Sequence, residues 1–263
     1  MATVPTTLLP GRRRADLACY VRDHAQATVR ELAEAFQVSP DTIRRDLDHL
    51  AERGVLTRTH GGAVPLGVLA TADAPLASRR SVRREAKERI GRATAHLIHD
   101  RETVILNGGT TALEVARSLG GLRDLTLVTN NLLVPAEVSS GSVRDLYVLG
   151  GTCRVPSMVT IGPVGFTGTG GIRADVAIIG VSGVSANGYS TTHLAEAQMM
   201  QEMIASAARV VILADSAKFG RTAFVHICPL EEASTLVTDA MPHPDLAEAL
   251  SAADVDIVVA DNS

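Results

Sequence analysis

The sequence contains no tryptophan, and aromatic residues make up only 3% of its 263 residues. Its hydrophobic cores must therefore consist mainly of aliphatic side chains, within an apolar content of 46%. A chain of this length and apolar content can form one small and one medium-sized domain, each with its own core.

Signals for disulfides and for membranes are missing as well. The three cysteines, Cys19, Cys153 and Cys228, are far apart and odd in number, so they form neither a CxxC pair nor a disulfide framework. No apolar run approaches the roughly 20 residues that cross a bilayer, and no basic start with an apolar stretch marks a signal peptide. We therefore expect a cytoplasmic protein in a reducing compartment, without membrane contact, bound metal or cofactor.

A strong positive charge is also absent. The net charge is −4, so any contact with nucleic acid has to come from a local patch of basic side chains. Residues 1–11 predict a flexible tail, 12–63 a compact unit, 64–78 a linker rich in alanine and proline, and 79–263 a larger domain. Residues 12–63 contain nine arginines and eight acidic residues, so this unit has a net charge of +1 and the rest of the chain has a net charge of −5.

Three helices are predicted in the compact unit. The first spans about 12–24, the second follows Thr28 as N-cap, and the third spans 40–53 after a short connector. Ser39 can cap the third helix, and a proline at its first position favours the helical start. A short connector between the second and third helices is typical of a helix-turn-helix.

The third helix has two distinct faces. Ile43, Leu47 and Leu50 recur at i, i+4 and i+7, which predicts a buried stripe. Arg44 and Arg45 fall on the opposite face, near the start of the helix. Exposed arginines in this position are suited to reading base edges in the major groove, although such a charge run can also be only a solvated face.

A two-stranded wing is predicted after the third helix. The segment 55–63 turns at two glycines, and its Arg58 and His60 can approach phosphates or the minor groove. One alternative is a winged helix that contacts only other proteins, in which case salt-dependent affinity for DNA would be absent.

The segment VRELAEAFQVSPDTIRRDLDHLAERGVLTRTHGGAVP resembles the N-terminal signature of the DeoR family of bacterial regulators, above all in TIRRDL and HGGA. The resemblance implies a DNA-binding transcriptional regulator in which Thr42, Arg44 and Arg45 face double-stranded operator DNA. It places Ser39 and Arg58 at the DNA backbone. Paired winged units would make the protein a homodimer or homotetramer on repeated half-sites.

Seven short apolar runs follow in the larger domain and alternate with amphipathic helical stretches. Continuous rather than alternating Val, Ile and Leu residues predict strands that are buried on both faces, as in a mostly parallel α/β sheet covered by helices. The runs are 103–107, 125–130, 145–151, 174–181, 209–215, 234–239 and 255–261.

Polar residues and glycines gather where these strands end, which is where open α/β sheets bind ligands. At the first strand end, glycines let a backbone approach an anion, and threonine hydroxyls with free helix N–H groups can donate to it. A tight strand-to-helix turn explains the same residues, and no nucleotide-binding fingerprint is present. The candidate ligand-binding residues are Asn107, Gly108, Gly109, Thr110, Thr111, Thr129, Asn130, Gly150, Gly151, Asp215 and Lys218.

Residues 79–261 resemble the DeoR-family sensor domain, in the stretches NGGTT, LVTNN, LGG, ANGYST, HLAEAQMM and LADSAKFG. The resemblance implies a fold related to ribose-5-phosphate isomerase and a small sugar or sugar-phosphate effector. We expect the effector to relieve repression, and activation is the alternative response. Two residues depart from the family pattern, because Asn107 stands where Asp is usual and Met200 where Lys is usual.

The second alternative is a sugar-phosphate isomerase that carries an accessory helical domain. Isomerases of this fold have an acidic run after a central strand, and the corresponding stretch here is Ile179–Gly183, which has no carboxylate. A general base for proton transfer is missing there, so the sequence favours a sensor over an enzyme.

Overall fold

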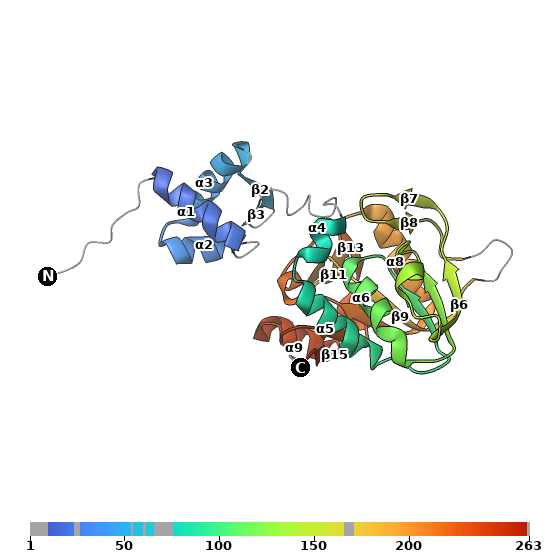
Figure 1. Cartoon of the computed structure of the whole chain (residues 1–263). Helices are drawn as coiled ribbons and strands as arrows, with labels where there is room; N and C mark the ends of the chain where they lie inside the picture. The colour runs from blue at the N-terminus through green and yellow to red at the C-terminus, as the bar shows by residue number, and fades with distance from the viewer. Residues whose placement is uncertain are drawn as a thin grey trace. The chain divides into compact units, whose positions relative to one another are not determined.

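The computed structural model of the chain describes residues 10–23, 27–53, 55–59, 62–65, 76–165 and 171–261. The chain divides into two units, Met1–Ala72 and Asp73–Ser263 (Figure 1). Within the described residues no helix is long and apolar enough to cross a membrane.

The N-terminal unit is the expected winged helix-turn-helix. Its helices pack around one aliphatic core that contains Leu17, Leu32, Ile43 and Leu47, all fully buried. The three strands form an antiparallel sheet in the order β1-β3-β2. The elements are α1 (Pro10–Asp23), β1 (Ala27–Thr28), α2 (Val29–Phe36), α3 (Pro40–Glu52), β2 (Leu56–Thr59) and β3 (Gly62–Pro65).

The starts of α2 and α3 are fixed by side-chain caps. Thr28 accepts a hydrogen bond from the backbone N–H of Glu31, whose carboxylate accepts one in return from the backbone N–H of Thr28. Ser39 Oγ accepts from the backbone N–H of Thr42, and Pro40 occupies the first turn of α3. These caps confirm the helix starts that the sequence predicts.

A buried ionic cluster joins α1 to α3. The Nε atoms of Arg13 and Arg14 lie 2.6 Å and 2.7 Å from the two carboxylate oxygens of Asp46, which is only 2% exposed. Burial by itself raises the pKa of Asp46, but hydrogen bonds and charge attraction from the two arginines outweigh it, so the pKa lies below its ordinary value. The cluster therefore holds two helices together only while Asp46 is ionised.

The C-terminal unit is built on a parallel sheet of seven strands, which confirms all seven predicted strands. Their order is β15-β14-β12-β9-β4-β5-β6, and every neighbouring pair is parallel. The strands are β4 (Thr103–Leu106), β5 (Leu125–Thr129), β6 (Val143–Val148), β9 (Ala174–Gly180), β12 (Ala207–Leu213), β14 (Thr235–Thr238) and β15 (Asp256–Val259).

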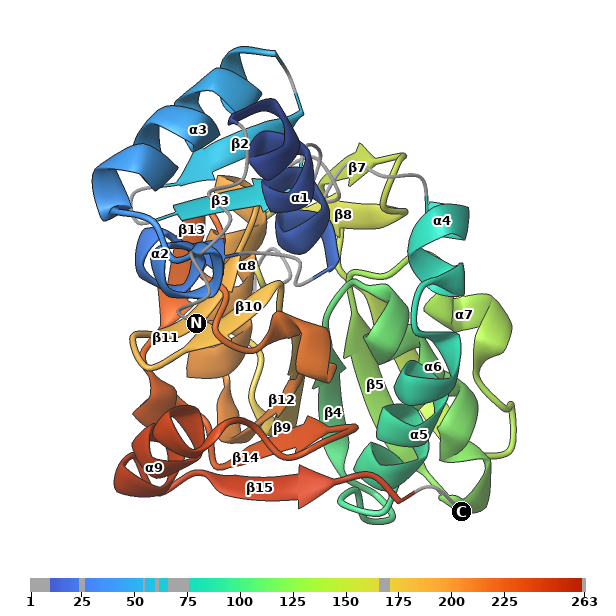
Figure 2. The same ribbon diagram turned by 90° about the vertical axis from the view of Figure 1, so that its left-hand side faces the viewer.

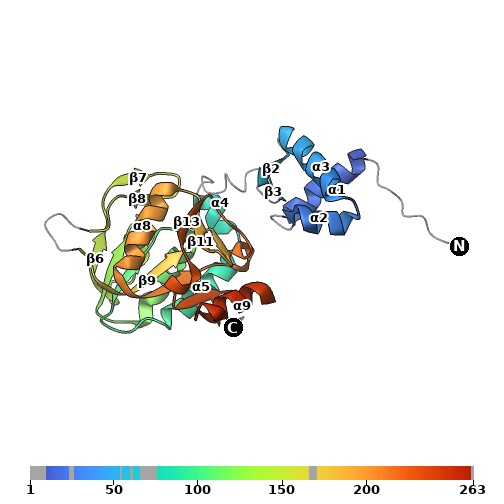
Figure 3. The same ribbon diagram turned by 180° about the vertical axis from the view of Figure 1, so that it is seen from behind.

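Helices cover both faces of this sheet, so strand residues alternate between two aliphatic cores. Val104 and Leu106 pack with residues of α5 (Arg84–Ala95) and α6 (Thr110–Ser118). Ile105 points the other way, into a core shared with α8 (Leu194–Ala205) and α9 (Pro244–Ala252). Figure 2 shows α5 and α6 beside β4 and β5, and Figure 3 shows α8 in front of β9.

Five short strands lie outside the seven that the sequence predicts. They are three or four residues long and each includes a polar residue, so they lack the continuous apolar runs that mark buried strands. One pair is the hairpin β7 (Thr152–Arg154) and β8 (Val159–Ile161). The other three form an antiparallel sheet of β10 (Gly183–Ser185), β11 (Gly188–Thr191) and β13 (Val225–Cys228).

Regular elements extend into the linker expected at 64–78. The wing strand β3 ends at Pro65, and helix α4 (Leu76–Ser81) precedes α5. Arg83, between the two helices, adopts a left-handed backbone with φ 52°. It is held by side-chain contacts to Asp239 at 2.6 Å and to Asp215 at 3.4 Å, which join the start of α5 to the ends of β12 and β14.

Replacing Gly91 with alanine is expected to destabilise the C-terminal unit by about 1–3 kcal/mol, because the added methyl group overpacks a helix contact. A Cβ atom at Gly91 on α5 would lie 2.6 Å from the backbone carbonyl carbon of Glu114 on α6. Gly121→Ala is the matched control, since nothing lies within 4 Å of a Cβ atom there. Urea unfolding of both variants measures the difference, and equal stability would contradict the close helix contact.

Candidate nucleic-acid interface and ligand pocket

The exposed face of α3 presents two arginines, of which one is paired with a carboxylate and the other is not. Arg44 Nη1 lies 2.6 Å from the carboxylate of Asp41, one turn earlier. Arg45 is exposed, and its side chain forms no hydrogen bond or ion pair with any part of the chain that the structure describes. Arg45 is therefore available to a base edge without first losing a partner, whereas Arg44 has to leave Asp41.

Two of the other predicted DNA contacts lie at the start of α3, and the backbone of a third lies in β2. Ser39 and Thr42 are hydrogen-bonded to each other through their hydroxyl oxygens at 2.9 Å, at the start of α3. Arg58 is placed in β2 opposite Ala63 by its backbone. The side chain of Arg58 and the whole of His60 lie outside the described residues.

A small pocket lies where β4 and β5 end and α6 begins. Gly109 immediately precedes α6 and has φ 135°, a conformation that favours glycine. At Gly108 a Cβ atom would collide with the side chain of Val159 in β8, so this position favours glycine. The lining residues are Arg79, Asn107, Gly108, Gly109, Asn130, Ser157, Val159, Glu196, Met199, Met200 and Met203.

Asn107 is fully engaged with the neighbouring strand. Its Oδ1 accepts a hydrogen bond from the backbone N–H of Gly180 at 2.8 Å, and its Nδ2 donates to the Gly180 carbonyl at 3.0 Å. The side chain is completely buried. An asparagine can make both bonds because it carries a donor and an acceptor, whereas an ionised aspartate can only accept. Asn107 therefore joins β4 to the end of β9.

Asn130, in contrast, retains a free acceptor. Its Nδ2 donates to the carbonyl of Thr160 at 2.8 Å and contacts Met199 Sδ at 3.4 Å. Its Oδ1 is buried and has no hydrogen-bond partner among the described residues. Unpaired buried oxygens are rare in proteins, so Asn130 Oδ1 is available to a hydrogen-bond donor.

Several predicted ligand residues have structural partners instead of lining the pocket. Thr129 Oγ1 donates to the carbonyl of Leu106 at 2.7 Å, and Thr110 and Thr111 form the first turn of α6. Gly150 and Gly151 adjoin β7, and the backbone of Gly151 lies against β8.

Asp215 and Lys218 lie in a neighbouring group of charges after β12. Asp215 is buried and accepts from the backbone N–H of Ala217 at 3.1 Å. The pKa of Lys218 is lowered by burial, partly offset by Asp215, and lowered further by Arg221, Arg79 and Arg83. A desolvated cation among other cations attracts an anionic ligand.

Lys87 belongs to the same group and is a residue that the sequence analysis missed. Its Nζ donates to the backbone carbonyl of Arg79 at 2.5 Å and to that of Val82 at 2.7 Å. Arg79 lies in the last turn of α4, and Val82 directly follows this helix. Burial lowers its pKa to about 8, while Asp215 raises it and Lys218 lowers it. Its position three residues before Ile90, on the apolar stripe of α5, is the sequence signal that could have revealed it.

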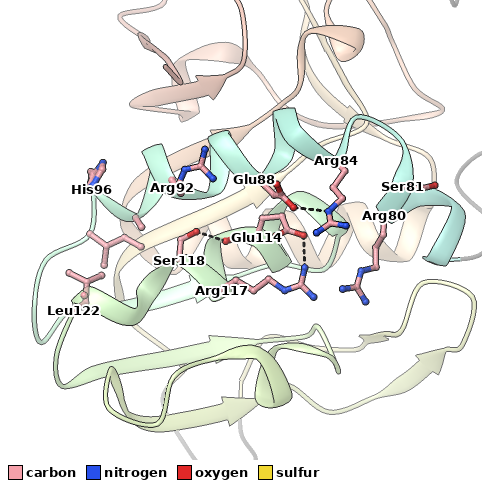
Figure 4. A pocket seen from close by; sticks show the side chains of 13 residues that line it. Arg80, Ser81, Arg84, Glu88, Arg92, His96, Glu114, Arg117, Ser118 and Leu122 are labelled. Atoms are coloured by element: carbon pink, nitrogen blue, oxygen red, sulfur yellow. Dashed lines mark hydrogen bonds and ion pairs between the residues drawn. The ribbon is translucent and has the colours of Figure 1, made fainter. Parts of the chain in front are cut away.

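A larger groove of about 1250 Å³ runs along α5 and α6, from Arg80 and Ser81 at one end to Leu122 at the other (Figure 4). Most of its charges pair with one another: Arg84 contacts Glu88 at 2.7 Å, and Arg117 contacts Glu114 at 2.8 Å. These pairs leave few free charged groups in the groove, whereas the smaller pocket lies at the strand ends, where open α/β sheets bind ligands.

Comparison with known families accounts for both units of the chain. Residues 13–66 match the model of the DeoR-like helix-turn-helix domain, and residues 82–240 match the DeoR C terminal sensor domain. The chain belongs to the DeoR family. It is a DNA-binding transcriptional regulator, as the resemblance in TIRRDL and HGGA predicts.

Curated DeoR-type relatives align over most of their own length. The transcriptional repressor GlcR of Bacillus subtilis is 32% identical, and the alignment covers 91% of this chain and 92% of GlcR. The repressor AccR of Agrobacterium fabrum is 33% identical, with 86% and 88% covered. The glycerol-3-phosphate regulon repressor of Escherichia coli is 32% identical, with 88% and 91% covered.

Among solved structures, a D-ribose-5-phosphate isomerase in complex with phospho-erythronic acid is similar with a TM-score of 0.38 and 17% identity. The similarity covers 52% of the DeoR-family chain and 54% of the isomerase. Within the described residues, no group of three or more His, Cys, Asp or Glu side chains is arranged to hold a metal ion.

Proposed function

We propose that this DeoR-family protein is a repressor that releases its operator when a small phosphorylated, sugar-type ligand occupies the pocket at the ends of β4 and β5. The observation that carries the proposal is a pair of desolvated lysines, Lys87 and Lys218, beside Arg79, which lines the pocket together with Gly108 and Gly109 just before α6. Free backbone N–H groups at a helix start and nearby cations together favour a phosphate. The printed names of the relatives, which include a glycerol-3-phosphate regulon repressor, support the same class of ligand.

The same contacts offer a route from the pocket toward the DNA-binding unit. Lys87 holds the end of α4 through two carbonyl oxygens, and α4 is the first helix of the C-terminal unit. A phosphate that draws the ammonium group of Lys87 away would weaken this hold on α4. A ligand that prefers one arrangement about 100-fold supplies about 2.7 kcal/mol of coupling.

We further infer that the pocket binds without catalysing a reaction. The buried Asp215 contacts Arg83 at 3.4 Å, and Glu196 contacts Arg154 at 2.9 Å. Carboxylates held by arginines are poor general bases, and the stretch Ile179–Gly183 contains none. Cytoplasmic location and a homodimer or homotetramer on paired half-sites belong to the same proposal, since helix-turn-helix units bind operators as symmetric pairs.

The test is an operator titration in the presence of sugar phosphates. An operator is selected from random-sequence DNA with the full-length protein, and its affinity is measured by fluorescence anisotropy. At least one of ribose 5-phosphate, glucose 6-phosphate and glycerol 3-phosphate is expected to weaken binding about tenfold or more, and Lys218→Met should abolish this response while leaving operator affinity intact.

Arg92→Met is the matched control, because Arg92 lines the separate α5–α6 groove. It should keep the full response to the phosphate. Operator affinity that stays unchanged across all three phosphates would refute this ligand class, and turnover of any of them would refute a purely regulatory role.

A further inference from the structure

Asn130 brings a hydrogen-bond acceptor to the pocket at the ends of β4 and β5. It directly follows β5 and is only 5% exposed, and its Oδ1 has no hydrogen-bond partner among the described residues. Its Nδ2 donates to the carbonyl of Thr160, which fixes the amide so that the oxygen is the atom left available. This oxygen lies 3.5 Å from where a Cβ atom of Gly108 would be, so it borders the glycine turn before α6.

Glu196 on α8 brings a second acceptor. It precedes Met199 and Met200 by three and four residues, so the three side chains share one side of the helix, and all three line the pocket. Arg154 of β7 contacts one carboxylate oxygen, Oε1, at 2.9 Å and is not among the described lining residues. The other oxygen, Oε2, has no hydrogen-bond partner in the described part of the chain. Since Asn130 also contacts Met199, both acceptors lie close to the same methionine.

The other uncharged polar side chains of the lining have few donors left. Both polar atoms of the Asn107 side chain bond to Gly180. Ser157, which is 6% exposed, donates its hydroxyl hydrogen to the carbonyl of Arg154 at 3.5 Å, so its oxygen can still accept. A ligand that reaches this part of the pocket therefore meets mainly acceptors.

The donors of the pocket are grouped with its positive charges. Arg79 is the cation among the described lining residues, and its backbone carbonyl accepts from Lys87 Nζ. Burial is the main cause of the lowered pKa of Lys87 and of Lys218, and the charge of Arg79 contributes to both. Arg79 therefore belongs to the cations that attract the phosphate, and the acceptors remain for the rest of the ligand.

The free space in the pocket is about 20 Å³, which is room for about one water molecule. An organic ligand therefore has to displace side chains. Met199, Met200 and Met203 can make room, because methionine is unbranched and has several rotatable bonds. Asn130 and Glu196 stay in place, since each is hydrogen-bonded to the β7–β8 hairpin, so the ligand meets both acceptors where the structure has them.

We infer that the effector is a sugar or polyol phosphate with an uncharged carbon skeleton, whose hydroxyl groups donate to Asn130 Oδ1 and Glu196 Oε2, and that the pocket rejects sugar-acid phosphates. The inference rests on the proposed function and narrows its ligand class. A hydroxyl group satisfies either acceptor. A carboxylate in its place brings only further acceptors and a second negative charge beside Glu196.

Pairs of a phosphate and its acid test this by isothermal titration calorimetry with the full-length protein. The pairs are glycerol 3-phosphate with 3-phosphoglycerate, ribose 5-phosphate with 5-phosphoribonate, and glucose 6-phosphate with 6-phosphogluconate. We expect the phosphate that binds most tightly to bind at least about 30-fold more tightly than its acid, because a like charge and an unsatisfied acceptor both oppose the acid. Attraction to the cations alone would favour the acid, which carries one more negative charge.

Two substitutions separate contact with the ligand from support of the fold. Glu196→Gln removes the charge at constant size and should reduce the preference to below about threefold. Arg154→Gln breaks the same ion pair but leaves the carboxylate, so the preference should keep its full size. Glu231→Gln, at an exposed site, is the control for net charge and should change nothing. Urea unfolding of each variant verifies that it is folded.

The outcomes distinguish the inference from the function on which it rests. An acid that binds as tightly as its partner, or a preference that Glu196→Gln leaves unchanged, overturns the inference and leaves the proposed function intact. An equal loss of preference in Arg154→Gln assigns the effect to the ion pair and overturns the inference too. If neither the three phosphates nor their acids bind, the proposed function and the inference both fall.

Discussion

Replacing Asp46 with alanine is expected to destabilise the winged helix-turn-helix by about 3–5 kcal/mol, the range found when one member of a buried ion pair is removed. Arg13 is only 8% exposed, so the substitution leaves a buried guanidinium group without its carboxylate. The loss should be seen as faster hydrogen exchange of the α1 and α3 amides in the full-length protein, with C-terminal amides unchanged.

Asp16→Ala is the control, because Asp16 is about half exposed and lies 4.0 Å from Arg12. Its effect should stay within about 0.5 kcal/mol, as is usual for exposed pairs. Equal exchange rates in the two variants would show that the buried cluster adds no stability.

The same cluster predicts a dependence on pH. The pKa of Asp46 in the folded protein lies below its ordinary value of 3.8. Its contribution is therefore complete above that ordinary value and is lost as the pH falls through the lower, folded value. The stability difference between wild type and Asp46→Ala should shrink on acidification below about pH 4 and remain constant from pH 5 to 8. A stability difference that grows in acid would contradict a lowered pKa of Asp46 in the folded protein.

Replacing Arg45 with alanine is expected to weaken operator binding by roughly 1–3 kcal/mol, which is the discrimination typical of one bidentate arginine–guanine contact. Arg45 is exposed on α3 and has no partner in the described part of the chain, so it can contact a base at no internal cost. Arg44→Ala should cost less, because Arg44 already bonds to Asp41. Fluorescence anisotropy at fixed salt measures both, since affinity for DNA depends steeply on ionic strength.

Arg30→Ala provides the control for charge alone. Arg30 is exposed on α2 and contacts Glu34 at 3.2 Å. If Arg30→Ala weakens operator binding as much as Arg45→Ala does, the effect comes from bulk charge, and α3 is not the base-reading element.

Most of the architecture follows from patterns of apolar residues along the sequence. Ile43 and Leu47 form the buried stripe of α3 that their spacing predicts. The seven central strands follow from runs too apolar to face water. These features are local in sequence, which is why they can be predicted without knowledge of contacts.

What the sequence analysis missed depends on contacts between distant residues. Asp46 belongs to an exposed-looking charge run, and only the approach of α1 buries it. Asn107 looks like a ligand residue, yet its partner is Gly180, which is 73 residues away. Val159 of β8 and the methionines of α8 line the same pocket as Asn107 and Asn130, although these residues are far apart in the sequence. The roles of the predicted ligand and DNA contacts stay predictions.

The strand order has a consequence for synthesis on the ribosome. β4 pairs with β5 on one side and with β9 on the other, and Val104 is opposite Val176. While the chain emerges, β4 therefore has an open edge until about seventy more residues have been made, and such edges promote aggregation. The winged unit, whose elements end at Pro65, can fold long before. Nascent chains should therefore pass through a stage in which the winged unit can bind DNA and the C-terminal unit cannot yet bind its ligand.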